Sequence, residues 1–466
     1  MSPASHSPGG LGDAFHKLWI GGFRRRKSGI CNPSPARTNI RNDDTYDIHD
    51  RRGSPPVAQQ PSTHAPGVRR VQGVIWSVAS LGAVAFVIRG FDRVRHAALW
   101  GEDGTIFLEG EHNIGPAALL DPYAGYLHIL PRLIATIAGV LPITASPTIY
   151  AAAAVAAYLV LASLVLSDRM AWLIPSPAGR AFAFVLLCLI PILDEVYGNI
   201  ANLIFVGGIG LAMLVMSGDP RTRGGTVAEI VTVLVLGLSG PLSVMFAPFF
   251  IHRWFRNGRT RHSLLVLATA TVTAIVQLAV YLNSTRSGTE GSGSIGILVR
   301  TAGYRVGGGW LYGTDDIIVV DGMHRWVQVN TMLWILAVGV VTLYALPKVA
   351  VAAWTLFTVL LVAPTMAYGD VFLSGGLILQ RHLITPTAIA LVLLVAVAFQ
   401  PHARQWIRSI AIGCLLLGAG AVVSSFPLYA HETEPQMDRV QACLNSDAPR
   451  CTVPGHPKGW TTTLNG

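Results

Sequence analysis

Two adjacent acidic residues, Glu102 and Asp103, lie between Gly101 and Gly104, shortly after a strongly apolar segment. A carboxylate next to a substrate hydroxyl can act as a general base, and flanking glycines allow close approach and unusual backbone angles. Two charges so near an apolar segment are costly unless water or a ligand covers them. The pair is therefore the first candidate for catalysis, and a solvated loop is the alternative.

A second group of polar residues follows in the sequence DPYAGYLHILPRL (121–133). Tyr123, Tyr126, His128 and Arg132 lie where an apolar segment begins, so they are suited to line a polar pocket that binds substrate. Aromatic belts also gather tyrosine at the membrane interface without any catalytic role. Such a belt is the alternative for each tyrosine.

Further polar residues lie in the sequence LDEVYGNIANLIF (193–205), which we expect to form a short turn between two spans. Asn199 and Asn202 are candidates for substrate binding, and their place before an apolar helix also suits helix capping. Asp194 and Glu195 form a second acidic pair. Ionisable groups at a helix end that faces a bundle interior are candidates for function.

Arginines occur late in the chain beside apolar segments. Arg381 and His382 come just before the apolar segment 383–399, and Arg305 lies in the connection 283–326. A guanidinium at that depth can hold a lipid phosphate through two parallel hydrogen bonds. The alternative is an arginine that extends to the interface only to keep its charge in water.

The composition identifies the setting of these residues. The chain is 52% hydrophobic and 13% charged, and many apolar runs approach the ~20 residues that cross a bilayer as a helix. The net charge of +9 does not indicate nucleic-acid binding, because the basic residues lie between apolar runs, where orientation in the membrane explains them. We predict an all-α, polytopic membrane protein of about 11 transmembrane or part-spanning helices.

The predicted spans are 71–90, 148–167, 181–197, 200–217, 263–282, 327–347, 350–368, 383–399 and 407–428. Segment 126–141 gives only about 24 Å of helix, short of the ~30 Å hydrocarbon core, so it is predicted to lie along the outer interface. Segment 226–251 is too short for two full spans and carries GLSGPL in its middle. Glycine and proline there predict two short helices that meet at a turn.

Lysine and arginine predict which side each connection faces. Residues 1–70 are rich in Pro, Ser and basic residues, which predicts a disordered cytoplasmic tail. The connections 167–180, 217–225 and 252–262 are then cytoplasmic. The membrane domain 71–428 places the acidic pair and Arg381 on the outer side of the cytoplasmic membrane, together with a short tail, 429–466.

Cysteine usage adds a prediction for that tail. Cys443 and Cys451 both lie in it, and an oxidising compartment favours a disulfide between them. Two free thiols are the alternative.

The order of these features resembles the GT-C superfamily, whose members are integral-membrane glycosyltransferases. The matching features are the outer acidic pair Glu102-Asp103, the aromatic and proline-rich segment 123–141, the small-residue-rich span in 146–169, the broken segment 237–250 and the late Arg381. The likeness covers roughly residues 71–400 by layout rather than by letters. The acidic pair is Glu-Asp where the family more often has Asp-Glu, which leaves open which of the two is the base.

The resemblance implies a sugar donor linked to a polyprenyl phosphate and a glycan or glycolipid acceptor, with membrane lipid around both. Asp103 or Glu102 would remove the acceptor proton, and Arg381 would hold the donor phosphate, with Arg305 or Arg132 as further contacts. Because the leaving group carries a single phosphate, no metal ion is required, although an acidic pair is able to recruit a divalent cation.

Two other classes of membrane protein use similar residues. A transporter, a lipid flippase or a polysaccharide polymerase would use buried polar groups as a pathway, but transporters often show repeated halves, which this sequence does not. The acidic pair also lies outside the spans. A non-enzymatic membrane protein is the remaining alternative, and the gathering of polar residues on one face argues against it.

Overall fold

Six helices in the part of the chain that the structure describes are long and apolar enough to cross a membrane, which makes this a multi-pass membrane protein. They are Ile143–Leu166, Arg261–Leu282, Arg325–Ala345, Pro347–Tyr368, Gln380–Ala398 and Gln405–Ser424. The structure is a computed structural model that describes residues 66–284, 292–313, 324–374, 379–431 and 435–466. The predicted tail 1–70 lies outside these residues as far as residue 65.

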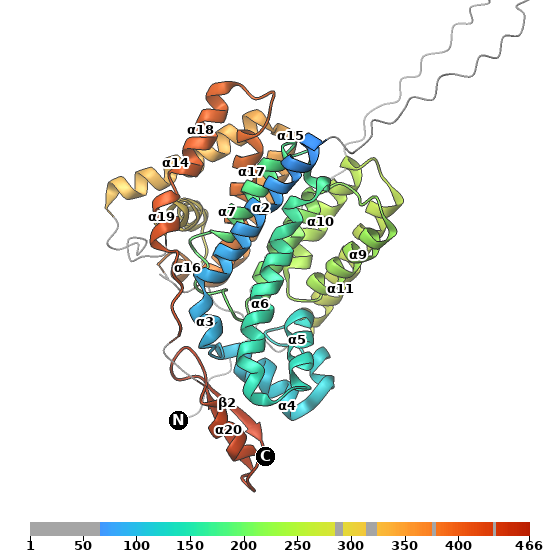
Figure 1. Cartoon of the computed structure of the whole chain (residues 1–466), viewed down its shortest axis with the longest axis vertical. Helices are drawn as coiled ribbons and strands as arrows, with labels where there is room; N and C mark the ends of the chain where they lie inside the picture. Colours follow the sequence, from blue (N-terminus) through green and yellow to red (C-terminus); the bar gives the residue numbers. More distant parts are fainter. Residues whose placement is uncertain (1–65, 285–291, 314–323, 375–378, 432–434) are drawn as a thin grey trace, which may run out of the picture. The chain divides into compact units, whose positions relative to one another are not determined.

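Residues 72–466 form one unit, built almost entirely of helices (Figure 1). Its α-helices are α2 (Pro66–Arg89), α3 (Phe91–Arg95), α4 (Glu109–Ile114), α5 (Ile129–Gly139), α6 (Ser146–Ser163), α7 (Pro177–Cys188), α8 (Leu203–Met216), α9 (Arg223–Gly237), α10 (Leu242–Arg256), α11 (Arg261–Leu282), α12 (Ile295–Arg300), α13 (Gly308–Tyr312), α14 (Arg325–Ala345), α15 (Pro347–Tyr368), α16 (Asp370–Ser374), α17 (Ile384–Ala398), α18 (Gln405–Leu416), α19 (Ala419–Ser424) and α20 (Met437–Leu444). Two π-helices, η1 (Asp103–Leu108) and η6 (Thr301–Gly307), interrupt this pattern. Short 3₁₀ turns are η2 (Gly115–Leu120), η3 (Ile143–Ala145), η4 (Leu164–Leu166), η5 (Asp168–Met170) and η8 (Gln380–Leu383).

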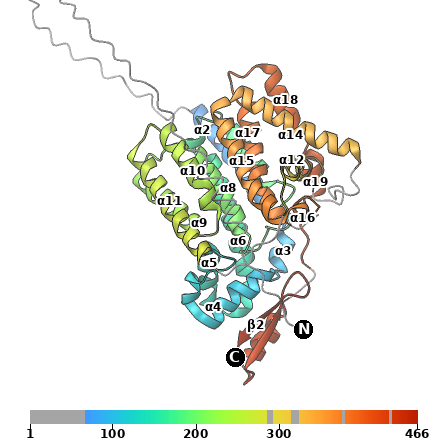
Figure 2. The same cartoon turned by 180° about the vertical axis from the view of Figure 1, so that it is seen from behind.

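Helices α8 and α17 form the centre of the core. Every residue of α17 is buried, as is nearly every residue of α8, and neither helix has a polar face. A helix that is apolar all round must be covered on all sides. Helix α17 packs against α7, α8, α14, α15 and α18, and α6 and α10 cover α8 (Figures 1 and 2).

The predicted span 181–197 is wrong in its second half. Helix α7 ends at Cys188 and α8 begins at Leu203, so an irregular segment, 189–202, joins them in place of a short turn. Pro191 explains the early end, because a proline disfavours the helical conformation of the residue before it and clashes with the carbonyl four residues back. Segment 189–202 is largely buried, so its backbone polar groups require partners inside the protein.

Segments 126–141 and 226–251, which are expected to form a short helix and two helices divided by a turn, have this secondary structure. Helix α5 has 11 residues, or about 16 Å, too short to cross a bilayer. Segment 226–251 is divided between α9 and α10, with the break at residues 238–241. Gly240 has φ +126° there, a conformation that strongly favours glycine.

Three connections that the charge pattern assigns to one side meet in one network of charges. The side chain of Glu229 is fully buried and contacts Arg253 at 2.5 Å, Arg169 at 2.7 Å and His262 at 2.7 Å. Asp219 accepts from Ser263 Oγ and Asn257 Nδ2, both at 2.7 Å, and lies 3.2 Å from Arg253. Connections 167–176, 217–222 and 257–260 therefore lie together, as expected if they share one leaflet.

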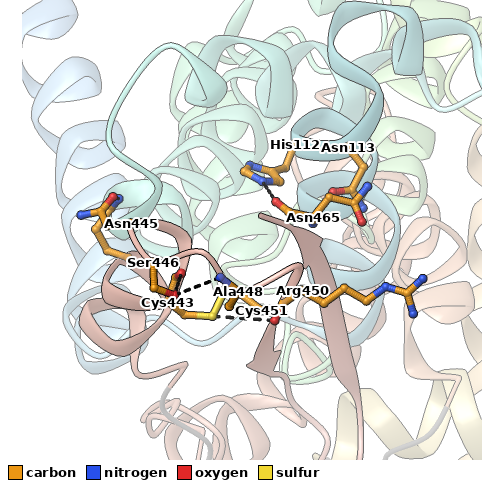
Figure 3. Close-up of a disulfide and its surroundings, with 10 residues drawn as sticks. His112, Asn113, Cys443, Asn445, Ser446, Ala448, Arg450, Cys451 and Asn465 are labelled. Atoms are coloured by element: carbon orange, nitrogen blue, oxygen red, sulfur yellow. Dashed lines mark hydrogen bonds between the residues drawn. A yellow bond between two sulfur atoms is a disulfide. The ribbon is translucent and has the colours of Figure 1, made fainter.

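The tail after α19 departs from the all-α prediction. Strands β1 (Arg450–Pro454) and β2 (Thr461–Asn465) form an antiparallel hairpin, and a disulfide joins Cys443 of α20 to Cys451 of β1 (Figure 3), which confirms that predicted pairing. Strand β2 lies against α4, where Asn113 Nδ2 donates to Thr463 O at 3.1 Å and Asn465 N donates to Asn113 Oδ1 at 2.9 Å.

The sidedness of the chain can be tested with single cysteines. In a Cys31→Ser background, Lys458→Cys should react with a membrane-impermeant maleimide in intact cells, whereas Arg221→Cys should react only after permeabilisation. Both positions are exposed, Cys188 and Cys414 are buried, and the remaining two cysteines form the disulfide. Equal labelling of the two variants in intact cells would contradict the predicted topology.

Candidate functional site

Asp103 begins the π-helix η1, and its side chain is fully buried. Its Oδ1 accepts from the Ala201 amide at 2.8 Å and its Oδ2 from the Ile200 amide at 3.3 Å, so the carboxyl group fixes the end of segment 189–202. Burial raises the pKa of Asp103 to about 8, although the two amides favour the ionised form. A general base must lie within hydrogen-bond reach of the proton it removes, whatever its pKa. Both oxygens of Asp103 accept backbone amides instead, so this residue positions segment 189–202.

The glycines beside the acidic pair have a different partner from the one the sequence suggests. A Cβ added to Gly101 would lie 2.6 Å from the ring of Trp460, and one added to Gly104 would overlap the hydroxyl of Thr462. Close approach is therefore required, but the approaching group is the C-terminal hairpin. His456 N donates to Leu99 O at 2.7 Å and continues this contact.

Glu195 and Arg381 form an ion pair at the centre of the site. Arg381 Nη1 donates to Glu195 Oε1 at 2.6 Å, and the Arg381 amide donates to Glu195 Oε2 at 2.9 Å. The side chains are 6% and 21% exposed respectively. Burial raises the pKa of Glu195, and the charge of Arg381 opposes that rise. The pair joins segment 189–202 to the start of α17.

Glu102 belongs to the same site. It is half-buried, unlike Asp103, and its charge acts on both Glu195 and Arg381. Tyr126 is also among the groups that interact electrostatically with Arg381. The acidic pair and the late arginine, which are far apart in the chain, are therefore brought to one place.

Capping is expected for Asn199 or Asn202, and only Asn199 makes a capping-type hydrogen bond, to the backbone amide three residues on. Asn202 is the residue before α8, yet its side chain accepts no capping hydrogen bond. The side-chain Nδ2 atoms of both asparagines donate to the carbonyl oxygen of Glu195, at 2.8 and 2.7 Å. Asn199 Oδ1 accepts from the backbone amide of Asn202. Both asparagines are nearly fully buried, so they orient Glu195.

Arg305 and His382 lie at the edge of this site. Arg305 is 2% exposed, donates to Phe372 O at 3.2 Å and interacts with the charge of Glu195. Burial lowers the pKa of Arg305 to about 10. The His382 ring packs against Phe205 and Phe372, with ring centroids 4.6 and 5.8 Å away. Arg305 lies in the second π-helix, and π-helical turns are frequent at functional sites.

The remaining predicted residues pack around His128, next to this site. His128 is 3% exposed, and its ring lies between those of Tyr123 and Tyr126, at 5.6 and 5.0 Å. Burial lowers the pKa of His128 to about 4, so the ring is neutral at physiological pH. Arg132 is 2% exposed and donates to Ile106 O and to Asp121. The structure therefore uses His128 and Arg132 for packing and local hydrogen bonds.

Two arginines that the sequence analysis did not select hold the other end of segment 189–202. Arg89 donates to the carbonyls of Ile190 at 2.7 Å and Pro191 at 3.1 Å. Arg93 donates to Asp194 O at 2.6 Å and forms an ion pair with its carboxylate. Arg89 ends α2 and Arg93 lies in α3, with the non-helical Gly90 between the two helices, so no helical spacing in the sequence indicates their shared partner.

Comparison with protein-family models, with curated proteins and with solved structures found no match. The function is therefore argued from the residues of this chain. Among the described residues, no group of three or more His, Cys, Asp or Glu side chains is arranged to hold a metal ion.

The ion pair in the site can be tested by stability. Glu195→Gln leaves Arg381 without its charged partner, and we expect a loss of roughly 3 kcal/mol in the free energy of unfolding. Replacing both residues with apolar ones, Glu195→Leu with Arg381→Met, should recover much of that loss. Thermal unfolding in detergent measures both effects. The control is Asp168→Asn, because Asp168 is 81% exposed in its pair with Arg180.

The raised pKa of Asp103 predicts a pH dependence. The unfolded carboxyl ionises near pH 4 and the folded one near pH 8, so the folded state binds the extra proton between these values. Stability should fall as pH rises through that window, by at most about 1.4 kcal/mol per pH unit. Asp103→Asn should lose this dependence, measured as the melting temperature at pH 5 to 9. Parallel curves for the wild type and the variant would contradict the prediction.

Proposed function

We propose that this chain is a membrane glycosyltransferase of the GT-C type, which moves a sugar from a polyprenyl-phosphate donor to an acceptor hydroxyl with inversion. The observation that carries the proposal is that Asp103, the neighbour of Glu102, binds the amides at the end of segment 189–202, and that Glu195 of the same segment pairs with Arg381. A half-buried carboxylate and a guanidinium are the two groups that such a transfer requires.

Glu102 is the better candidate for the base. Its side chain is partly exposed, whereas the carboxyl of Asp103 is fully buried and accepts two amides. In the proposed reaction Glu102 takes the proton of the acceptor hydroxyl, whose oxygen attacks the anomeric carbon. The bond from that carbon to the donor phosphate oxygen breaks, and the products are the inverted glycoside, polyprenyl phosphate and protonated Glu102.

Arg381 is the candidate for the phosphate contact. Its side chain is 21% exposed, so part of it is accessible. Glu195 and the two asparagines fix its position, which lowers the cost of orienting it when the donor binds. A fixed guanidinium stabilises the negative charge that develops on the leaving phosphate. Arg305 adds a second positive charge that interacts with Glu195.

The proposal predicts that removing the Glu102 carboxylate lowers catalysis without lowering stability. Glu102→Gln should lower the rate of sugar transfer at least 100-fold with an unchanged melting temperature, because it removes the base and no buried contact. Transfer is measured with membranes containing the variant and labelled polyprenyl-phosphate sugars, with and without EDTA. The control is Asp438→Asn, an exposed carboxylate of α20 on the same predicted side.

Normal transfer by Glu102→Gln would refute its assignment as the base. Wild-type membranes that move intact lipid-linked sugar between leaflets but transfer none would favour the flippase alternative. A chain that does neither would favour a non-enzymatic role.

A further inference from the structure

An open hollow of ≈190 Å³ lies beside the helix that carries the acidic pair. Because α4 directly continues η1, Glu109 follows Glu102 by seven residues on one continuous helix. The lining residues are Thr105, Ile106, Glu109, Gly110, Asn113, Ile114, Asp121, Pro122, Tyr123 and Arg132. The hollow is distinct from the ion pair of Glu195 and Arg381.

The charged groups of the hollow do not favour an anion. Glu109 and Asp121 contribute two carboxylates, and the two terminal nitrogens of Arg132 already donate to Ile106 O and Asp121. The lining therefore has a net negative charge, which repels phosphate. Carboxylate and amide oxygens accept hydrogen bonds from hydroxyl groups, and the Asn113 amide can also donate one.

The wall of the hollow is held by the C-terminal hairpin. Glu109 Oε2 accepts from the Thr463 amide at 3.1 Å, and Asn113 exchanges hydrogen bonds with Thr463 and Asn465. His112 Nε2 lies 2.8 Å from Asn465 O (Figure 3). These contacts fix the polar side chains before any ligand arrives, which reduces the entropy lost on binding.

We propose that this hollow binds one neutral saccharide unit of the acceptor, at a distance from the hydroxyl that reacts. A sugar ring presents hydroxyls at its edge and C–H groups on its faces. The hollow offers carboxylates and an amide beside the apolar groups of Ile106, Ile114 and Pro122. The inference rests on the proposed function, since it assigns the ligand to the same acceptor.

The dimensions favour a single ring and a longer acceptor. A volume of ≈190 Å³ lies below the range of pockets for drug-sized ligands. Glu102 and Glu109 are separated by more than one helical turn, so we assign the reacting hydroxyl and the ring bound in the hollow to different sugars. The acceptor is therefore an oligosaccharide or a glycolipid with more than one sugar.

Ile114 allows a test that leaves the polar contacts intact. It lines the hollow and is 55% exposed, so Ile114→Trp should fill the space without unfolding the chain. The matched control is Ile137→Trp, the same substitution at an exposed isoleucine of α5 that does not line the hollow. With acceptors of three or four sugars, Ile114→Trp should raise KM about 10-fold and leave kcat within 2-fold. With a single-sugar acceptor, both variants should resemble the wild type.

A binding measurement separates the two proposals. Saturation-transfer NMR on the full-length protein in detergent uses a panel of neutral gluco-, galacto-, manno- and arabino-oligosaccharides of one to four units. At least one should bind the wild type and Ile137→Trp but not Ile114→Trp, equally in 50 and 500 mM NaCl. Binding of these neutral probes that disappears in high salt would contradict a site held by neutral hydrogen bonds and overturn the proposal.

The remaining outcomes are equally distinct. Equal transfer rates for both variants at every acceptor length would overturn the saccharide site. So would the absence of binding by any saccharide of the panel to any of the proteins. Neither result would contradict the transferase assignment. If the wild type binds a saccharide, Ile114→Trp abolishes that binding and no transfer activity is found, the proposed function alone would be overturned.

Discussion

The buried segment 189–202 is the constraint on which the site depends. A chain without regular structure cannot satisfy its own amides and carbonyls, and within a membrane protein it is tolerated only where other parts of the protein supply partners. Arg89 and Arg93 bind its carbonyls at one end, and Asp103 binds its amides at the other. The groups that hold this segment thereby bring Glu195 to Arg381.

The two ends of the helical unit use charge in different ways. In the network around Glu229, Oε1 contacts Arg253 and Arg169 and Oε2 contacts His262, so both oxygens of this buried carboxylate are paired and the network is structural. At the candidate site, Glu102 and Arg381 keep partial exposure. Buried charges that are fully paired resist change, whereas a pair with one accessible member can exchange its partner for a ligand.

The sequence predicts most of the membrane fold and part of the site. Hydrophobic runs are local signals, so the spans and the break between α9 and α10 follow from apolar length and from glycine and proline. The early end of α7 is not apparent from the sequence because Pro191 lies inside an apolar run. Nor does the sequence show that the side chain of Asn202 is turned toward Glu195 O, to which its Nδ2 donates. The pairing of Glu195 with Arg381 depends on tertiary contacts that no local pattern encodes.

The hairpin that lies against η1 and α4 also orders events in the life of the chain. Asn465 bonds to Asn113, 352 residues earlier, and Trp460 covers Gly101. The acidic helix is thus synthesised early but lacks one of its supports until the ribosome has made the hairpin and that hairpin has reached the same compartment. A protein shortened before β2, or one whose tail is retained on the wrong leaflet, would insert all of its spans and still carry an incompletely supported acidic helix.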